Sequence, residues 1–301
     1  MELVNSESIS GFRQSMIDRG RLRATVDAYN RDIVNFLTFL TDSDTPHGAI
    51  GLETLESFKN WQINKGSRSS SVRRSVIAIR MFFRWLDERG SIHGSPFDDA
   101  PVPAHDHCKA REITPDQVQL MIAGSGIQET RLKSLRDTVL IFLLAHEGLK
   151  VSELTLLSWT HFFAAGASGR LSIPGDRART IGLEAETTEA ILSYRRALSE
   201  DHRTKNQLTG AAPLIVSFKG ADARAVQFGI TRHGLKFAVY EIGQLANLRQ
   251  LNAEQLRHAA MEHKLSLGFT PEMLMNHLGL RRIGNIGKHL SAAPSDAPTN
   301  V

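Results

Sequence analysis

Cysteine is almost absent from this chain of 301 residues, since Cys108 is the one thiol. A single cysteine excludes a disulfide framework and any zinc site built from several cysteines. Long apolar runs are missing as well: the longest, Val139 to Ala145, spans seven residues, far short of the ~20 that cross a bilayer. The first residues lack the apolar stretch of a secretory signal. We therefore expect a cytoplasmic protein without a membrane segment.

What the chain does have is a modest excess of positive charge. Lysine and arginine number 36 against 32 aspartate and glutamate residues, which gives a formal net charge of +4. Six of the basic residues lie between Lys65 and Arg84, where no acidic residue occurs. Arg73, Arg80 and Arg84 fall on one side of an expected helix there. Such a face is typical either of a solvated helix or of a surface that follows phosphates.

The spacing of apolar residues predicts two domains. Spacings of three and four recur in four segments of the N-terminal part, which predicts a four-helix domain over residues 1–92. Several prolines in residues 93–111 predict a linker. The capping-box pattern of Thr114 to Gln117 marks the start of a second domain, assigned to residues 112–290. Residues 291–301 are expected to be a disordered tail.

The second domain is expected to be mixed, so the fold class is mainly α with a small β-hairpin or sheet. Residues 170–174 and 180–183 alternate around Gly175 and predict the hairpin. Helices are expected on both sides of it, at about 132–146, 185–200, 228–245, 253–267 and 271–278.

Three segments of this domain are informative by their order and spacing: Glu147-Gly148-Leu149-Lys150-Val151-Ser152-Glu153-Leu154, Leu256-Arg257-His258-Ala259 and Met275-Asn276-His277-Leu278-Gly279. With the helical N-terminal part, the proline-rich linker and residues 213–220, they resemble the tyrosine recombinases, the phage-integrase family. The resemblance covers most of residues 5–290. It implies an N-terminal core-binding domain of the SAM-like type, a C-terminal domain of the catalytic type, double-stranded DNA as partner, and neither metal nor nucleotide as cofactor.

In the family, a set of cationic donors holds the scissile phosphate, and the first of these positions are altered here. Lys150 stands where the resemblance implies an arginine; it keeps the charge but cannot make a bidentate pair of hydrogen bonds. The hairpin lysine of the family corresponds to Pro174, which has no donor. Arg177 or Arg179 could contact the phosphate in its place, although arginine is too basic to give up a proton readily.

The remaining family positions also depart from the pattern. Arg257 is retained, but Glu254 occupies a position of histidine or lysine, and Leu280 one of histidine or tryptophan. The position of the nucleophilic tyrosine corresponds to His289. The sequence has three tyrosines, all interpreted as packing residues: Tyr29, Tyr194 and Tyr240.

These substitutions predict a DNA-binding, recombinase-like pseudoenzyme that has lost strand transfer, and that acts beside an active recombinase, as a regulator, or as a remnant of a mobile element. The residues expected to contact DNA are Lys150, Arg177, Arg179 and Arg257 in the second domain, and Arg73, Arg80 and Arg84 in the first. Two alternatives remain open. One is a working recombinase or integrase with a displaced or partner-supplied nucleophile, and the other is a protein scaffold that does not bind DNA.

The histidines do not predict a metal site. His105, His107 and Cys108 lie close together in the linker, but no second ligand cluster has a zinc-like spacing. His258 and His263 are not on one helical face, and His277 is alone on its helix. A glycine-rich phosphate loop is also missing. We therefore expect no metal, no nucleotide and no other cofactor.

Overall fold

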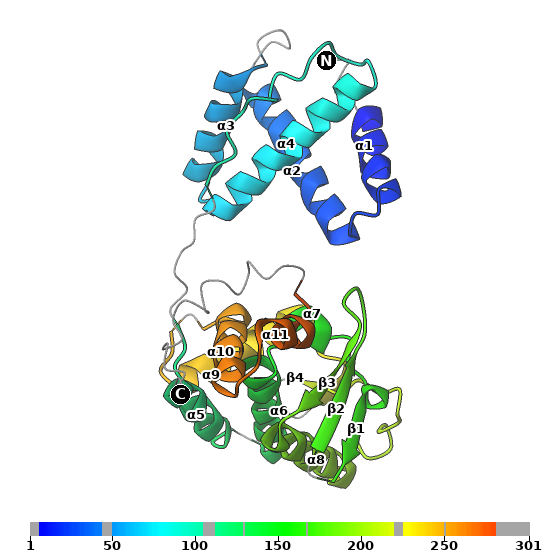
Figure 1. Ribbon diagram of the computed structural model, residues 1–301, viewed down its shortest axis with the longest axis vertical. Helices are drawn as coiled ribbons and strands as arrows, with labels where there is room; N and C mark the ends of the chain where they lie inside the picture. The colour runs from blue at the N-terminus through cyan, green and yellow to red at the C-terminus, as the bar shows by residue number, and fades with distance from the viewer. Residues whose placement is uncertain are drawn as a thin grey trace, which may run out of the picture. The chain divides into compact units, whose positions relative to one another are not determined.

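The computed structural model describes residues 6–43, 50–104, 112–128, 130–166, 168–219, 225–249 and 251–280. The chain divides into two compact units, Met1–Cys108 and Lys109–Val301 (Figure 1). Each unit has a buried apolar cluster of its own. Among the described residues, no helix combines the length and the apolar character that a membrane span requires.

The first unit consists of four helices, as the spacing of its apolar residues predicts: α1 (Ser6–Asp18), α2 (Arg23–Asp42), α3 (Leu52–Asn64) and α4 (Ser69–Glu88). Their buried faces meet in a core rich in aromatic rings. The Phe36 ring lies edge-on to Phe58, with the ring centroids 5.0 Å apart, and edge-on to Phe83 at 6.2 Å. Such edge-to-face pairs add to the stabilisation that comes from burial alone.

The start of the expected linker belongs to this core, so its assignment to residues 93–111 is wrong at the N-terminal end. Phe97 is fully buried and its ring packs 4.8 Å from that of Phe83. Arg80 donates to the carbonyl oxygens of Asp98 and Ala100 at 2.7 and 2.9 Å. Helix α4 already ends at Glu88, and the prolines that follow it do not free the chain, because the large apolar side chain of Phe97 between them is buried in the core.

The arginine face of α4 is occupied by the same segment. Besides Arg80, Arg84 donates to the Asp98 carboxylate at 2.9 Å, and Arg73 donates to the carbonyl oxygen of Pro103. These three guanidinium groups were expected to contact DNA. The structure shows them holding residues 98–103 against α4, a structural role that neither interpretation of the sequence, a solvated face or a phosphate-following surface, had included.

The second unit is a mixed domain in which helices surround small antiparallel sheets. Its helical elements are α5 (Pro115–Ser125), α6 (Arg131–Ile141), the π-helix η2 (Phe142–His146), α7 (Val151–Leu154), the 3-10 helix η3 (Trp159–His161), α8 (Ala185–Glu200), α9 (Arg232–Leu245), α10 (Ala253–Ser266) and α11 (Pro271–Leu278). Its strands are β1 (Phe162–Ala165), β2 (Ser168–Ile173), β3 (Arg179–Leu183), β4 (Val216–Lys219) and β5 (Ala225–Phe228).

The expected hairpin is present as β2 and β3, with Leu171 opposite Ile181. A third strand, β1, pairs with β2 and completes a sheet of order β1-β2-β3, while β4 and β5 form a separate pair. Strand β1 was not predicted, because Phe162 is its only buried residue and a short strand with one buried position shows no alternation.

The longest apolar run of the sequence lies at the centre of the second unit. All seven residues from Val139 to Ala145 are buried, at the end of α6 and in η2. The run therefore forms a central helical segment that is covered on every side by the second unit. This agrees with its length, which is too short to cross a membrane.

Candidate nucleic-acid interface

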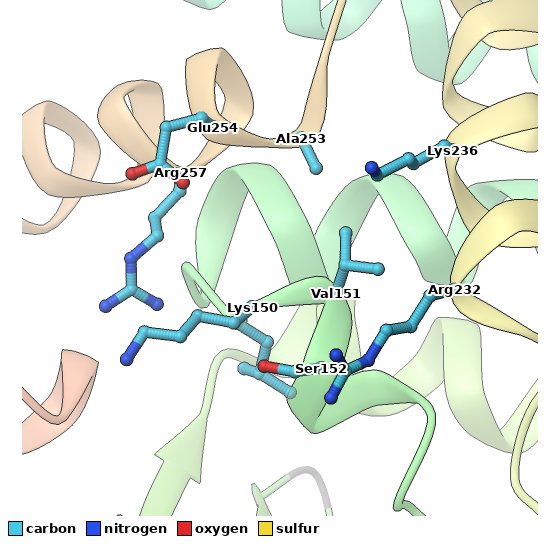
Figure 2. A pocket seen from close by; sticks show the side chains of 9 residues that line it. Lys150, Val151, Ser152, Arg232, Lys236, Ala253, Glu254 and Arg257 are labelled. Atoms are coloured by element: carbon cyan, nitrogen blue, oxygen red, sulfur yellow. The ribbon is translucent and has the colours of Figure 1, made fainter. Parts of the chain in front are cut away.

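A pocket with several cationic side chains opens where the loop after η2 meets α9 and α10. We call it the basic pocket, and Figure 2 shows its lining: Leu149, Lys150, Val151, Ser152, Arg232, Lys236, Ala253, Glu254 and Arg257. Lys150 and Arg257 lie on one side of it and Arg232 and Lys236 on the other (Figure 2). Four cations and one carboxylate in one hollow create a positive potential that attracts an anionic ligand.

Glycine is required at the sharp turn that leads into the basic pocket. Gly148 has a φ of +65°, and a Cβ there would collide with the side chain of Leu278. After the turn, the backbone N–H of Lys150 donates to the Glu153 carboxylate at 2.8 Å, which caps the first turn of α7. The turn and the cap together fix the direction in which the Lys150 side chain leaves the backbone.

Lys150 is half-buried at the wall of the pocket. Burial, together with the positive charges of Arg257 and Arg179, lowers the pKa of the Lys150 ammonium from its usual value, and the nearby Glu153 opposes this. A phosphate in the pocket would restore the preference for the charged form, because an opposite charge stabilises an ammonium. Lys150 is therefore suited to contact an anion, as the sequence predicts.

Arg257 has a different role from the expected one. Its side chain is only 2% exposed, and its guanidinium donates to two backbone carbonyl oxygens, those of Gly148 and of Leu278, the latter at 2.6 Å. Burial lowers the pKa of Arg257, against the attraction of Glu153 and Glu254. The retained family arginine thus lines the pocket while its described hydrogen bonds hold the turn and the end of α11 together.

We expect Arg257→Ala to lower the free energy of unfolding by about 2–4 kcal/mol, because two buried carbonyl groups lose a charged donor. Arg257→Lys is expected to recover only part of this loss, since one ammonium cannot span both carbonyl oxygens as the guanidinium does. Urea unfolding followed by circular dichroism measures both variants. Unfolding midpoints equal to that of the wild type would contradict this structural role.

The two arginines of the hairpin do not line the basic pocket. Arg179 forms an ion pair with Glu153, with Nη1 2.8 Å from Oε1, and its Nε donates to the carbonyl oxygen of His277 at 2.7 Å. Gly279 is needed beside it, because a Cβ there would lie 2.8 Å from Nη1 of Arg179. Arg177 lies in the turn before β3 and accepts from Arg179 through its carbonyl oxygen. Arg179 therefore joins β3, α7 and α11. Its guanidinium forms an ion pair with Glu153 in place of the predicted contact with phosphate.

The remaining substituted positions lie as follows. Glu254 is exposed in the first turn of α10 and lines the basic pocket, so a carboxylate does face the cations. Leu280 packs on the small apolar cluster of Met261, Leu274 and Leu278. Pro174 lies just after β2, and the structure gives it no donor. His289, expected at the place of the nucleophile, and the group His105 to Cys108 lie outside the described residues.

Two cations of the basic pocket were not predicted from the sequence. Arg232 and Lys236 are exposed on the first turns of α9. They are four residues apart and therefore share one helical face. The helix itself is expected from the sequence, and the four-residue spacing of Arg232 and Lys236 was the signal that could have identified them.

Comparisons with known proteins agree with this architecture. Residues 9–90 match the family described as phage integrase, N-terminal SAM-like domain. The tyrosine recombinase XerC of Rhodospirillum centenum is 26% identical over 291 residues, which cover 94% of this chain and 79% of the relative. XerC of Roseiflexus sp. is 23% identical and covers 97% of this chain and 92% of its own.

Solved structures show the same fold. The Tn1549 transposon integrase in complex with transposon right end DNA aligns with a TM-score of 0.70 and 15% identity, covering 96% of each chain. The XerH recombinase bound to difH aligns with a TM-score of 0.67 and 17% identity, covering 89% of this chain and 76% of its own. The chain therefore has the two-domain fold of the tyrosine recombinases and phage integrases. Its sequence is similar to tyrosine recombinases along nearly its whole length.

Proposed function

We propose that this protein binds double-stranded DNA through the basic pocket and does not cleave it, acting as an accessory or regulatory member of a recombination system. One observation carries the proposal: the basic pocket keeps four cationic side chains, while the sequence offers no tyrosine after Tyr240 that could attack a phosphate in it. Phosphate binding needs positive charge, whereas strand transfer also needs a nucleophile.

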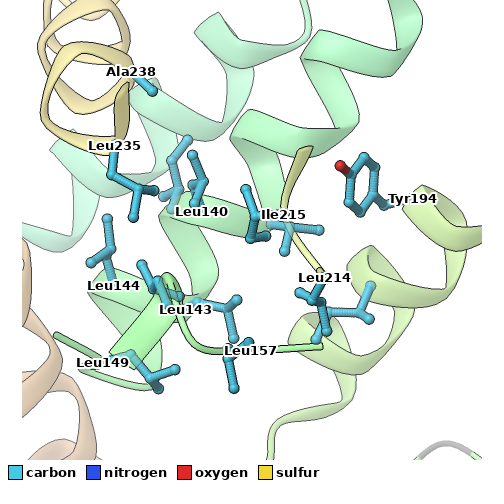
Figure 3. Close-up of a cluster of buried hydrophobic side chains, with 14 of the residues drawn as sticks. Leu140, Leu143, Leu144, Leu149, Leu157, Tyr194, Leu214, Ile215, Leu235 and Ala238 are labelled. Carbon is cyan, nitrogen blue, oxygen red and sulfur yellow. The ribbon is translucent and has the colours of Figure 1, made fainter. Parts of the chain in front are cut away.

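The tyrosines that the chain does have are unsuited to attack. Tyr194 is fully buried in the core of the second unit, where its hydroxyl oxygen accepts from the backbone N–H of Val216 at 3.2 Å (Figure 3). Burial also raises the pKa of Tyr194 above its ordinary value, which disfavours the phenolate. Tyr29 packs against the core of the first unit. Tyr240 is on α9 but does not line the basic pocket.

The donors of the pocket support binding more than chemistry. Loss of one donor to a transition state costs about 10²–10³ in rate, and here Pro174, Glu254 and Leu280 supply none of the family's donors. The hydrogen bonds of Arg257 go to Gly148 and Leu278. Lys150, Arg232 and Lys236 remain as cations that face the hollow. Electrostatic attraction to a DNA backbone survives these changes, while acceleration of strand cleavage does not.

We expect no covalent protein–DNA adduct when the full chain is incubated with nicked suicide duplexes that trap a 3′-linked protein. Denaturing electrophoresis measures this, with an active XerC-type recombinase on its own site as the positive control. A pool of duplexes with randomised sequence avoids the need to know the target. His289→Tyr alone is also expected to form no adduct, because Pro174, Glu254 and Leu280 stay in place. An adduct of the wild type that disappears in His289→Ala would show an active recombinase instead.

A further inference from the structure

Three side chains outside the basic pocket converge on one point of the second unit. His146 ends η2, Glu184 is the N-cap of α8, and His263 belongs to α10. One ligand atom of each lies within 4.8 Å of the others: a ring nitrogen of each histidine and a carboxylate oxygen. Nothing in the proposed DNA binding uses this cluster, which therefore calls for an explanation of its own.

The two distances from the Glu184 carboxylate to the histidines are close to those around a tetrahedral metal ion. Nε2 of His263 lies 2.9 Å from Oε2 of Glu184, and Nδ1 of His146 lies 3.6 Å from the same oxygen. Ligands at ~2.0–2.1 Å from a tetrahedral Zn²⁺ are about 3.3–3.4 Å apart. Shifts of a few tenths of an ångström bring both pairs to that separation. The two imidazole rings already lie close together, with centroids 4.4 Å apart.

An unpaired buried nitrogen gives an independent indication of a ligand. His146 is 6% exposed, and its Nδ1 is buried without a hydrogen-bond partner, although it is 3.6 Å from the Glu184 carboxylate. Buried polar atoms almost always have a partner, so such an atom needs an explanation. A metal ion between the three groups would accept this lone pair. The side chains of Glu184 and His263 are 23% and 30% exposed, which leaves a path for an ion and room for a water ligand.

The charges around the cluster also favour a cation. Lys264 is 1% exposed; its ammonium donates to Glu147 at 2.7 Å and to Oε1 of Glu184. Two carboxylates and one ammonium leave one negative charge when the histidines are neutral. The Lys264 ammonium engages Oε1, so it leaves Oε2 directed at the two ring nitrogens. Partners behind the ligands orient them in this way in metal sites.

We propose that His146, Glu184 and His263 form a binding site for Zn²⁺, with water as the fourth ligand. Imidazole nitrogens together with one carboxylate suit zinc, while Mg²⁺ and Ca²⁺ prefer sites made only of oxygen atoms. The ion would connect η2, α8 and α10, and so stabilise the second unit. This proposal does not depend on DNA binding.

The test is a Zn²⁺ titration of the full-length, metal-stripped protein by calorimetry, with Co²⁺ absorption as a reporter of tetrahedral geometry. We expect one site, a Co²⁺ spectrum without a thiolate band, and a higher melting temperature with Zn²⁺. His263→Ala is expected to weaken Zn²⁺ binding at least ~10²-fold, since even the loss of a group that only hydrogen bonds to a metal ligand costs 10–100-fold in affinity. His202→Ala is the matched control, because His202 is 85% exposed and its side chain is no part of the cluster.

Two further variants keep the proposal open to refutation. His105, His107 and Cys108 could bind zinc elsewhere, so the triple variant with alanine at all three must retain the site. His263→Gln can still hydrogen bond to Glu184 and serves if His263→Ala unfolds; circular dichroism shows whether each variant is folded. Absence of Zn²⁺ binding in the wild type would overturn the proposal. So would wild-type affinity in folded His263→Gln, or loss of binding in the triple variant alone.

Discussion

Lys264→Met is expected to lower the free energy of unfolding by about 3–5 kcal/mol, the typical cost of removing one partner from a buried ion pair. The Lys264 ammonium lies between Glu147, which is fully buried, and Glu184. Methionine has a similar length but no charge, so the change leaves the Glu147 carboxylate buried without its cation. The loss should be visible as a large drop of the urea midpoint, followed by circular dichroism.

A second substitution separates charge from packing. Glu147→Gln in the Lys264→Met background removes the uncompensated carboxylate, and the double variant is expected to be more stable than Lys264→Met alone. The control is Arg131→Met, which breaks an ion pair with Glu200 whose side chains are 73% and 54% exposed. Arg131→Met should lower the free energy of unfolding by no more than about 1 kcal/mol. Equal losses in Lys264→Met and Arg131→Met would contradict the importance of the buried network.

The triple variant Lys150→Ala, Arg232→Ala, Lys236→Ala is expected to lose most of the affinity for duplex DNA. Each phosphate contact contributes ~0.9 to the slope of log K against log salt concentration, so three lost contacts reduce the slope by up to about 2.7. Fluorescence anisotropy with a labelled duplex at several salt concentrations measures both quantities. All three side chains line the basic pocket, so the change tests the pocket as a whole.

The matched control removes one cation from another part of the same unit. Arg196 is exposed on α8, the helix labelled next to the sheet in Figure 1. Helix α8 contributes no residue to the lining of the basic pocket. Arg196→Ala is therefore expected to keep the wild-type slope of log K against log salt concentration. If the triple variant has the wild-type affinity and slope, DNA is not bound at the basic pocket. A wild-type protein whose weak binding does not depend on salt would favour the protein scaffold considered above.

The sequence predicted the helices well because their signal is local. Apolar residues three and four positions apart define α2 and α4, and the capping box of Thr114 and Gln117 is present at the start of α5. The predicted linker begins too early, because a high proline content shows only that a segment is not helical. It does not show whether a side chain such as Phe97 is buried in a core. Burial of that ring depends on α4, which precedes it closely, and also on α2, which lies far from it in the chain.

The site was predicted only in part, for a related reason. Lys150, Glu254 and Arg257 do meet, as the resemblance implies. The sequence position of a cationic residue does not predict its hydrogen-bond partners, however. Arg257 donates to a carbonyl oxygen 109 residues away, and Arg179 donates to Glu153, 26 residues away. His146 and His263 come together across a similar distance in the chain. Residue types fix what a side chain can do, and the tertiary fold decides which partner it finds.

The hydrogen bonds of Arg257 connect two segments that are far apart in the sequence. One guanidinium holds both the turn that carries Lys150 and the residue that ends α11. Displacement of either the turn or the end of α11 would cost the same buried guanidinium a hydrogen bond, so one side chain couples the positions of these two elements.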